Sequence, residues 1–208
     1  MDPSMDALTE RARALVRKER RAILGITGPP GAGKSTIAAA IVDGVGADAR
    51  LVGMDGFHLA RAELARLGRL HRKGAPDTFD AFGYVALLRR LRDHTEPVVY
   101  TPRFERAMEE PIAGAVAIER HVTLVVTEGN YLLMEDGAWA DIRRLLDTCW
   151  YVDLPEEVRH QRLTSRHERY GRSVAEALGR TLGSDQANAA VVAATRHRAD
   201  LVITMGSA

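Results

Sequence analysis

The chain has 208 residues, 46% of them hydrophobic, a size that usually forms one compact domain. Its 29 basic and 28 acidic side chains nearly cancel, and no stretch combines Lys and Arg with aromatic residues, so we expect no nucleic acid as a partner. Cys149, the only cysteine, cannot form an internal disulfide, and no signal peptide or long apolar run is visible. We therefore predict one cytoplasmic domain over 1–208 that binds no membrane and is a monomer or a homodimer.

Predicted strands and helices alternate along the chain. An amphipathic helix is predicted over 5–21, and continuous apolar runs predict buried parallel strands at 22–27, 50–54, 122–127, 148–154 and 200–204. Further helices are predicted at 34–45, 82–94, 138–146, 155–169, 173–183 and 185–197, with Ser173 and Asp185 as N-caps. This alternation predicts an α/β fold in three layers, with helices on both faces of a five-stranded parallel sheet.

A long insertion separates the second and third predicted strands, over about 55–120. It contains two short apolar stretches, 97–102 and 115–120, that predict a β-hairpin, together with most of the turn residues of the chain. Because ligand sites in α/β folds gather on loops at the carboxyl ends of the strands, we expect this insertion to bind a ligand.

A phosphate-binding loop is predicted between the first strand and the helix at 34–45. Glycines there let backbone N–H groups converge on phosphate oxygens, and the helix that follows presents its positive end. The lysine adds a charge and the serine hydroxyl is a ligand for Mg²⁺. An ordinary Gly/Pro turn is the alternative. The predicted nucleotide-binding residues are Gly28, Pro29, Pro30, Gly31, Ala32, Gly33, Lys34, Ser35 and Thr36.

Two acidic residues follow predicted strands and are candidates for catalysis. Glu128 ends an apolar run, where a carboxylate can bind Mg²⁺ directly or through water. Asp55 comes directly after the second strand, where it can accept a proton from an attacking hydroxyl or orient a metal-bound water. The alternatives are a solvated glutamate and a plain Asp-Gly turn. The sequence lacks the Asn-Lys-x-Asp element of guanine-specific switches, and its histidines lack the spacing of a zinc site.

Six motifs together resemble the uridine kinase, phosphoribulokinase and pantothenate kinase superfamily of phosphate-loop kinases. They are GPPGAGKS, MDGFHL, RKGAPDTFD, VVYTPRFERAMEEPIAGA, VTEGNYLL and RADLVI, within about residues 20 to 204. Among its members the chain looks most similar to a bacterial group provisionally named as fructose-transport-system or nucleoside/nucleotide kinases. The resemblance implies a P-loop kinase fold with strand order 2-3-1-4-5, ATP and Mg²⁺ as cofactors, and transfer to a hydroxyl of a small molecule.

The resemblance also implies roles for particular residues. Asp55 matches the acid thought to act as base, and Ser35, Glu128 and Asp55 match the metal site. The residues that match or adjoin the acceptor-binding segments are His58, Lys73, Asp77, Asp80, Arg103, Arg106 and Tyr131. Two points stay open: Asp80 is equally suited to cap the helix that begins near Ala81, and this chain has Glu105 where the motif favours Asp.

Arginines recur along the predicted helix at 155–169, which resembles the lid helix of these kinases, with the lid ending at about 172. They are Arg159, Arg162, Arg166 and Arg169, and their spacing of three and four residues places several on one face. Such a face can neutralise charge on a transferring phosphoryl group, whereas the alternative is a solvated helix. By alignment with lid arginines, Arg162 and Arg166 join Lys34 and Asp55 as the predicted catalytic residues.

The sequence thus predicts an ATP- and Mg²⁺-dependent kinase that phosphorylates an alcohol on a sugar, a nucleoside or a pantothenate-like acceptor. Two alternatives stay open: a regulatory nucleotide-binding NTPase that has no small-molecule acceptor, and a degenerate kinase that only binds ATP. The apparent acceptor-binding motifs of the insertion argue against the first. The presence of Lys34, Ser35, Asp55 and Glu128 argues against the second.

Overall fold

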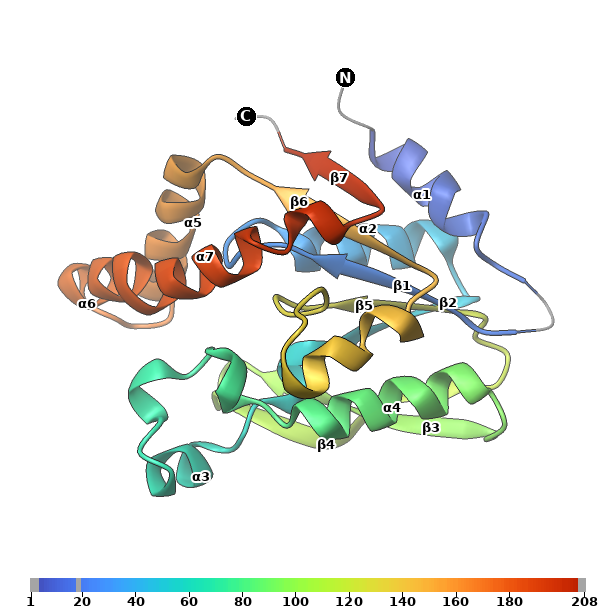
Figure 1. The fold of residues 1–208 in the computed structure, drawn as a ribbon, viewed down its shortest axis with the longest axis horizontal. Helices are drawn as coiled ribbons and strands as arrows, with labels where there is room; N and C mark the ends of the chain where they lie inside the picture. The colour runs from blue at the N-terminus through green and yellow to red at the C-terminus, as the bar shows by residue number, and fades with distance from the viewer. Residues whose placement is uncertain (1–3, 18–19, 206–208) are drawn as a thin grey trace.

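Five parallel strands form a central sheet in the computed structural model, which describes residues 4–17 and 20–205 (Figure 1). They are β1 (Ala22–Thr27), β2 (Ala49–Gly53), β5 (Leu124–Glu128), β6 (Thr148–Asp153) and β7 (Leu201–Thr204). Their order across the sheet is β2-β5-β1-β6-β7. The labels β3 and β4 belong to a separate hairpin, so counting the parallel strands alone gives 2-3-1-4-5. The predicted fold class is confirmed.

Helices cover both faces of the sheet (Figure 1). α1 (Met5–Arg13) and α2 (Lys34–Val45) pack on one face, and α4 (Ala81–Asp93) packs on the other. The predicted first helix over 5–21 is wrong beyond Arg13. After Arg13 the chain leaves the helix through a turn in which the Leu15 and Val16 N–H groups donate to carbonyls three residues back. Residues 17–21 are all charged, so a helix continued through them would bury no further apolar side chain, and Arg17 instead forms a β-bridge with Arg20. Residues 18–19 lie outside the described ranges.

Two apolar cores lie on opposite faces of the sheet because successive side chains of a strand alternate in direction. In β1, Ile23 packs in the core beneath α4, whereas Leu24 packs in the core beneath α1 and α2. In β6, Tyr151 and Trp150 alternate in the same way. Trp139, like Trp150, is a buried core residue.

The insertion begins with a 3₁₀ turn at Met54–Phe57 and continues through α3 (Arg61–Arg66) and two further 3₁₀ turns, Leu70–Arg72 and Pro76–Thr78. After α4, β3 (Val98–Glu105) and β4 (Glu110–Glu119) form an antiparallel hairpin. The predicted hairpin is confirmed, and its strands are longer than the apolar stretches at 97–102 and 115–120. The sequence analysis missed α3, although the spacing of Leu64 and Leu67 before Gly68 is typical of a helix end.

The C-terminal third contains α5 (Glu156–Arg169), α6 (Val174–Arg180) and α7 (Gln186–Ala193). Ser173 caps α6 as predicted, in a capping box with Glu176. The prediction that Asp185 is an N-cap is wrong. α6 continues into α7 through a π-helical segment, Thr181–Asp185, so Asp185 lies inside continuous helix and its carboxylate bonds another residue. The helices of the described ranges are all too short or too polar to cross a membrane.

The predicted helix at 138–146 is also wrong, because two 3₁₀ turns, Gly137–Asp141 and Arg143–Leu145, occupy this segment. The N–H groups of Ile142 and Leu145 donate to carbonyls three residues back. Buried Ala138, Trp139 and Ile142 are spaced by one to three residues, and that spacing suits a 3₁₀ turn as well as an α-helix. Periodicity alone therefore could not separate the two.

Candidate active site

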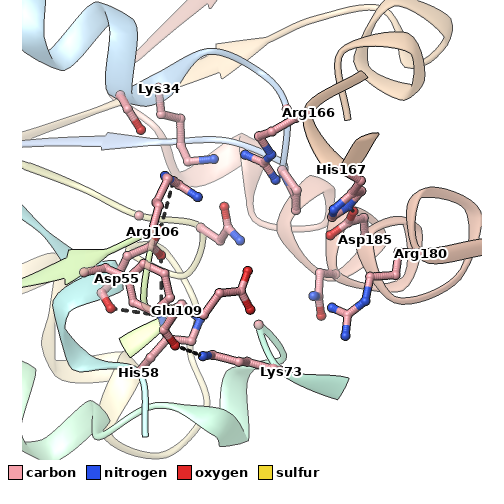
Figure 2. A pocket seen from close by; sticks show the side chains of 18 of the residues that line it. Lys34, Asp55, His58, Lys73, Arg106, Glu109, Arg166, His167, Arg180 and Asp185 are labelled. Atoms are coloured by element: carbon pink, nitrogen blue, oxygen red, sulfur yellow. Dashed lines mark hydrogen bonds and ion pairs between the residues drawn. The ribbon is translucent and has the colours of Figure 1, made fainter. Parts of the chain in front are cut away.

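The carboxyl ends of β1, β2 and β5 meet at one edge of the sheet. In the strand register, Glu128 at the end of β5 lies beside Ile26 of β1 and Gly53 of β2. The loop at 28–33 follows β1 directly, and Asp55 lies in the turn that follows β2. A cavity of about 980 Å³, open mouth included, adjoins this edge, and Figure 2 shows Lys34 and Asp55 on its walls.

The loop between β1 and α2 has the backbone of a phosphate cradle. Gly33, directly before α2, has a φ of 95°, which favours glycine, and the free N–H groups of the first helical turn open toward the loop. Gly28 also has a positive φ and lies so close to the Val152 carbonyl that no side chain would fit there. The sequence pattern therefore predicts this loop correctly, because its glycines are needed for the backbone geometry.

Lys34 is buried at the mouth of the loop, only 7% exposed, and its ammonium donates a hydrogen bond to the Pro29 carbonyl at 3.0 Å. Burial lowers the pKa of Lys34 to about 8, although the charges of Glu128 and Asp55 act in the opposite direction. The site thus holds a costly positive charge that an anion would stabilise.

Ser35, Glu128 and Asp55 form a set of oxygen ligands that fits Mg²⁺. The Ser35 hydroxyl donates to Glu128 Oε1 at 3.2 Å. Burial, and then the charge of Asp55, raises the pKa of Glu128, so a cation between the two carboxylates would relieve both effects. Within residues 4–17 and 20–205 no three His, Cys, Asp or Glu side chains are grouped as a metal site. Oxygens of a bound phosphate would therefore have to complete the coordination, as is usual for Mg²⁺.

Two other residues of the insertion contact Asp55. Arg106, in the turn of the hairpin, lies 3.7 Å from Asp55 Oδ2, and His58 Nδ1 donates to the Asp55 carbonyl at 2.9 Å. Burial, opposed by Asp55, lowers the pKa of His58, so this imidazole is neutral near pH 7. Gly56 leaves room for the Pro102 backbone of β3, since a side chain would come within 2.7 Å of it. The hairpin thus fixes the turn that carries Asp55.

The arginines of α5 divide into separate roles. Arg166 lines the main cavity, and both Arg162 and Arg166 line an adjoining cavity over Gly31, Gly33 and Thr36. Arg159 is instead 3% exposed and bonds the Pro30 carbonyl and Gln186, so it braces the loop from outside. Arg169 is exposed and lines neither cavity. The predicted pair, Arg162 and Arg166, therefore faces the loop.

Residues 23–208 match the sequence profile of the Phosphoribulokinase / Uridine kinase family. The chain belongs to this family. The "Putative uridine kinase C227.14" of Schizosaccharomyces pombe is 31% identical over 96% of this chain and 90% of its own length. The "Uncharacterized protein YggC" of Escherichia coli is 32% identical over 91% of this chain and 80% of its own length.

Solved structures of P-loop kinases share the fold. The structure titled "putative fructose transport system kinase" from Silicibacter sp. TM1040 superposes with a TM-score of 0.87, at 34% identity, over 96% of this chain and 98% of its own. YFH7 of Saccharomyces cerevisiae, titled a "putative P-loop containing kinase", gives 0.83 over 99% of both chains; its identity of 18% supports the fold alone. This chain is thus a P-loop kinase of the uridine kinase and phosphoribulokinase type.

Four predicted acceptor residues of this kinase do not line the cavity. Asp80 caps α4, accepting from the Gly83 N–H at 2.8 Å, the alternative that the sequence left open. Asp77 pairs with Arg72 at 2.8 Å, and Arg103 points to solvent beside Glu105. Tyr131 is fully buried and donates to the Gly74 carbonyl at 2.5 Å, so it supports the wall from behind. Their geometry does not support direct contact with an acceptor.

Lys73, His58 and Arg106 do line the cavity, and with them a group of side chains that the sequence analysis missed. Four of the missed residues, Phe79, Phe104, Glu109 and Asn130, lie inside the motifs quoted above but were not singled out, and the others lie in the α5–α7 region, where no motif marks them. Among them, His167 and Asp185 are in contact, with 2.7 Å between Nε2 and Oδ2, but they are 18 residues apart in the sequence, so no local pattern could have paired them. The missed residues are Phe79, Phe104, Glu109, Asn130, His167, Tyr170, Arg172, Arg180, Asp185 and Asn188.

Proposed function

We propose that this kinase transfers the γ-phosphate of Mg-ATP to a hydroxyl group of a small metabolite in the cytoplasm. One observation carries the proposal: a single cavity joins the phosphate loop and its buried Lys34 to a second polar end that the insertion builds. A regulatory nucleotide switch has no need of that second end. The names of two similar proteins, the "Putative uridine kinase C227.14" and the "putative fructose transport system kinase", support a nucleoside or a sugar as the acceptor class.

In the proposed reaction, the acceptor oxygen forms a bond to the γ-phosphorus while the bond from that phosphorus to the β,γ-bridging oxygen breaks. ADP leaves with the bonding electrons, and the acceptor proton passes to the Asp55 carboxylate. Lys34, Arg162 and Arg166 orient the phosphates and neutralise the charge that develops on them. Ser35, Glu128 and Asp55 would hold Mg²⁺, which would supply positive charge that stabilises the negative charge of the phosphates.

A transfer screen tests the proposal directly. Purified protein, Mg²⁺ and γ-labelled ATP are incubated with nucleosides, pentoses, hexoses, polyols and pantothenate. Each neutral compound is tested beside its phosphate ester or carboxylic acid derivative where one exists. We expect label in one acceptor class, with no transfer by Lys34→Met. ATP hydrolysis that no acceptor accelerates, with no labelled product, would instead favour the regulatory NTPase.

Loss of the lid arginines should affect turnover more than nucleotide affinity. We expect Arg166→Ala to lower kcat by roughly 10–100-fold and Arg162→Ala to lower it by less. Neither loss should be larger, because Arg106 and the remaining arginine still neutralise charge on the phosphoryl group. Arg166 lines both cavities and Arg162 only one. Steady-state kinetics with ATP titrations checks this, with the exposed Arg169→Ala as a matched control. If kcat is unchanged in all three variants, the arginines of α5 belong to a solvated surface and take no part in phosphoryl transfer.

Nucleotide binding should change the protonation of Lys34. Because the pKa of Lys34 is lowered to about 8, this side chain is mostly neutral in the free protein near pH 9. A bound triphosphate stabilises the ammonium, so binding near pH 9 should take up as much as about one proton, and little below about pH 7. Calorimetric titration of a non-hydrolysable Mg-ATP analogue in buffers of different ionisation enthalpy measures this uptake. The same uptake in Lys34→Met would assign it to another group.

A further inference from the structure

The end of the main cavity away from the phosphate loop is enclosed by two parts of the chain that are distant in sequence. Lys73 comes from the insertion, whereas Arg172 and Arg180 come from the end of α5 and from α6. All three also line a neighbouring cavity, so they lie where the two cavities join. In Figure 2 Lys73, with Glu109 beside it, and Arg180 border this space.

Three cations, Lys73, Arg172 and Arg180, line this end of the cavity against two carboxylates, Glu109 and Asp185. Glu109 lies 3.6 Å from Arg61, and Asp185 accepts a hydrogen bond from His167 at 2.7 Å. In the described part of the chain, none of Lys73, Arg172 and Arg180 forms an ion pair with a carboxylate. The far end of the cavity therefore has an excess of positive charge.

These cations are held toward the cavity rather than extended into solvent. The Lys73 ammonium donates to the Glu109 carbonyl and lies 5.0 Å from the centre of the Phe104 ring. Arg172 donates to Nδ1 of His167 at 3.1 Å, and the bond from His167 to Asp185 fixes that imidazole. Burial lowers the pKa of Lys73, the charges of Glu109 and Glu110 act in the opposite direction, and Arg61 and Arg180 add to the lowering, so Lys73 and Arg180, which line the same two cavities, repel each other. An anion between them would remove this repulsion.

We infer that the acceptor of this kinase carries an anionic group, a phosphate or a carboxylate, that binds between Lys73 and Arg180. The inference rests on the proposed function and narrows its substrate class from hydroxylated metabolites to phosphorylated sugars or hydroxy acids. An acceptor held by this group at the far end can extend its hydroxyl toward Asp55. Because Lys73 lies in the insertion and Arg180 in the lid region, the same anion would draw the two together over the reacting groups.

Binding experiments test the inference separately from the reaction. The phosphate loop is first filled with a non-hydrolysable Mg-ATP analogue, and matched pairs are then titrated by calorimetry: ribose against ribose 5-phosphate, fructose against fructose 6-phosphate, glycerol against glycerate, and sorbitol against gluconate. We expect an anionic member to bind at least about 10-fold more tightly than its neutral counterpart. The phosphate and carboxylate pairs distinguish the two kinds of anion.

Variants then locate the anionic group. Lys73→Met and Arg180→Ala should each weaken the binding of the anionic member by roughly 10–100-fold, as expected for a lost charge-assisted hydrogen bond, and leave the neutral member unaffected. Lys73→Arg should retain much of the preference, and Arg169→Ala should retain all of it. If Lys73 and Arg180 had only a structural role, replacing them would weaken the binding of the neutral and the anionic members equally.

The outcomes separate this inference from the proposed function. If anions bind in a way that depends on Lys73 and Arg180, but no label is transferred to any acceptor, the anion site is supported and the kinase activity is contradicted. Transfer to a neutral acceptor that binds as well as its anionic counterpart would support the kinase and overturn the anion site. Failure of every anionic member to bind overturns the inference whatever the transfer screen shows.

Discussion

Asp55→Asn should lower kcat by roughly 10²–10⁴-fold, the usual effect of removing a general base, while ATP affinity stays close to that of the wild type. Asparagine keeps the size of the side chain and its hydrogen bonds, but it cannot accept the acceptor proton. The lower part of the range is expected, because a loose phosphoryl-transfer transition state needs little early deprotonation. Single-turnover transfer to the identified acceptor, with ATP binding measured alongside, checks this.

Asp43→Asn is the matched control for this variant, because Asp43 is an exposed carboxylate on α2. It should behave as the wild type. Near-normal transfer by Asp55→Asn would show that Asp55 is not the general base but a turn residue that pairs with Arg106. A collapse of Mg-ATP binding would instead place its main role at the metal, beside Glu128.

Lys34→Ala should lower kcat/KM by roughly 10²–10³-fold, because it removes the only buried ammonium among the described residues at the phosphate loop. Folding should be little affected. Burial already opposes the charge of Lys34, as its lowered pKa shows, and the hydrogen bond lost is a single one to the Pro29 carbonyl. Thermal unfolding and nucleotide titration together separate a loss of function from a loss of structure.

Lys34→Met refines this experiment, since it keeps the apolar stem and removes only the charge. We expect it to lose nucleotide turnover as Lys34→Ala does and to unfold at the wild-type temperature or above it. Unchanged ATP affinity and turnover in either folded variant would overturn the assignment of 28–35 as a phosphate loop.

Local sequence patterns were sufficient to predict the sheet and the phosphate-binding side of the site. Continuous apolar runs identify the five buried strands, and glycine at positions such as 28 and 33 is required by the backbone. Since parallel strands end at one edge, the residues that follow them, Asp55 and Glu128, had to lie near the loop. These are local patterns with one geometric solution, which is why they could be read without a structure.

Only the tertiary structure decided the rest of the site. Spacing along α5 cannot show that Arg159 is buried against the loop whereas Arg166 faces the cavity, because that depends on how the helix is rotated against its neighbours. Nor does any local pattern mark Arg180, which reaches the cavity because α6 packs on α5 beyond the edge of the sheet. The cationic end of the acceptor site, where we propose that an anion binds, depends on contacts between distant segments, and these form only when the chain is folded.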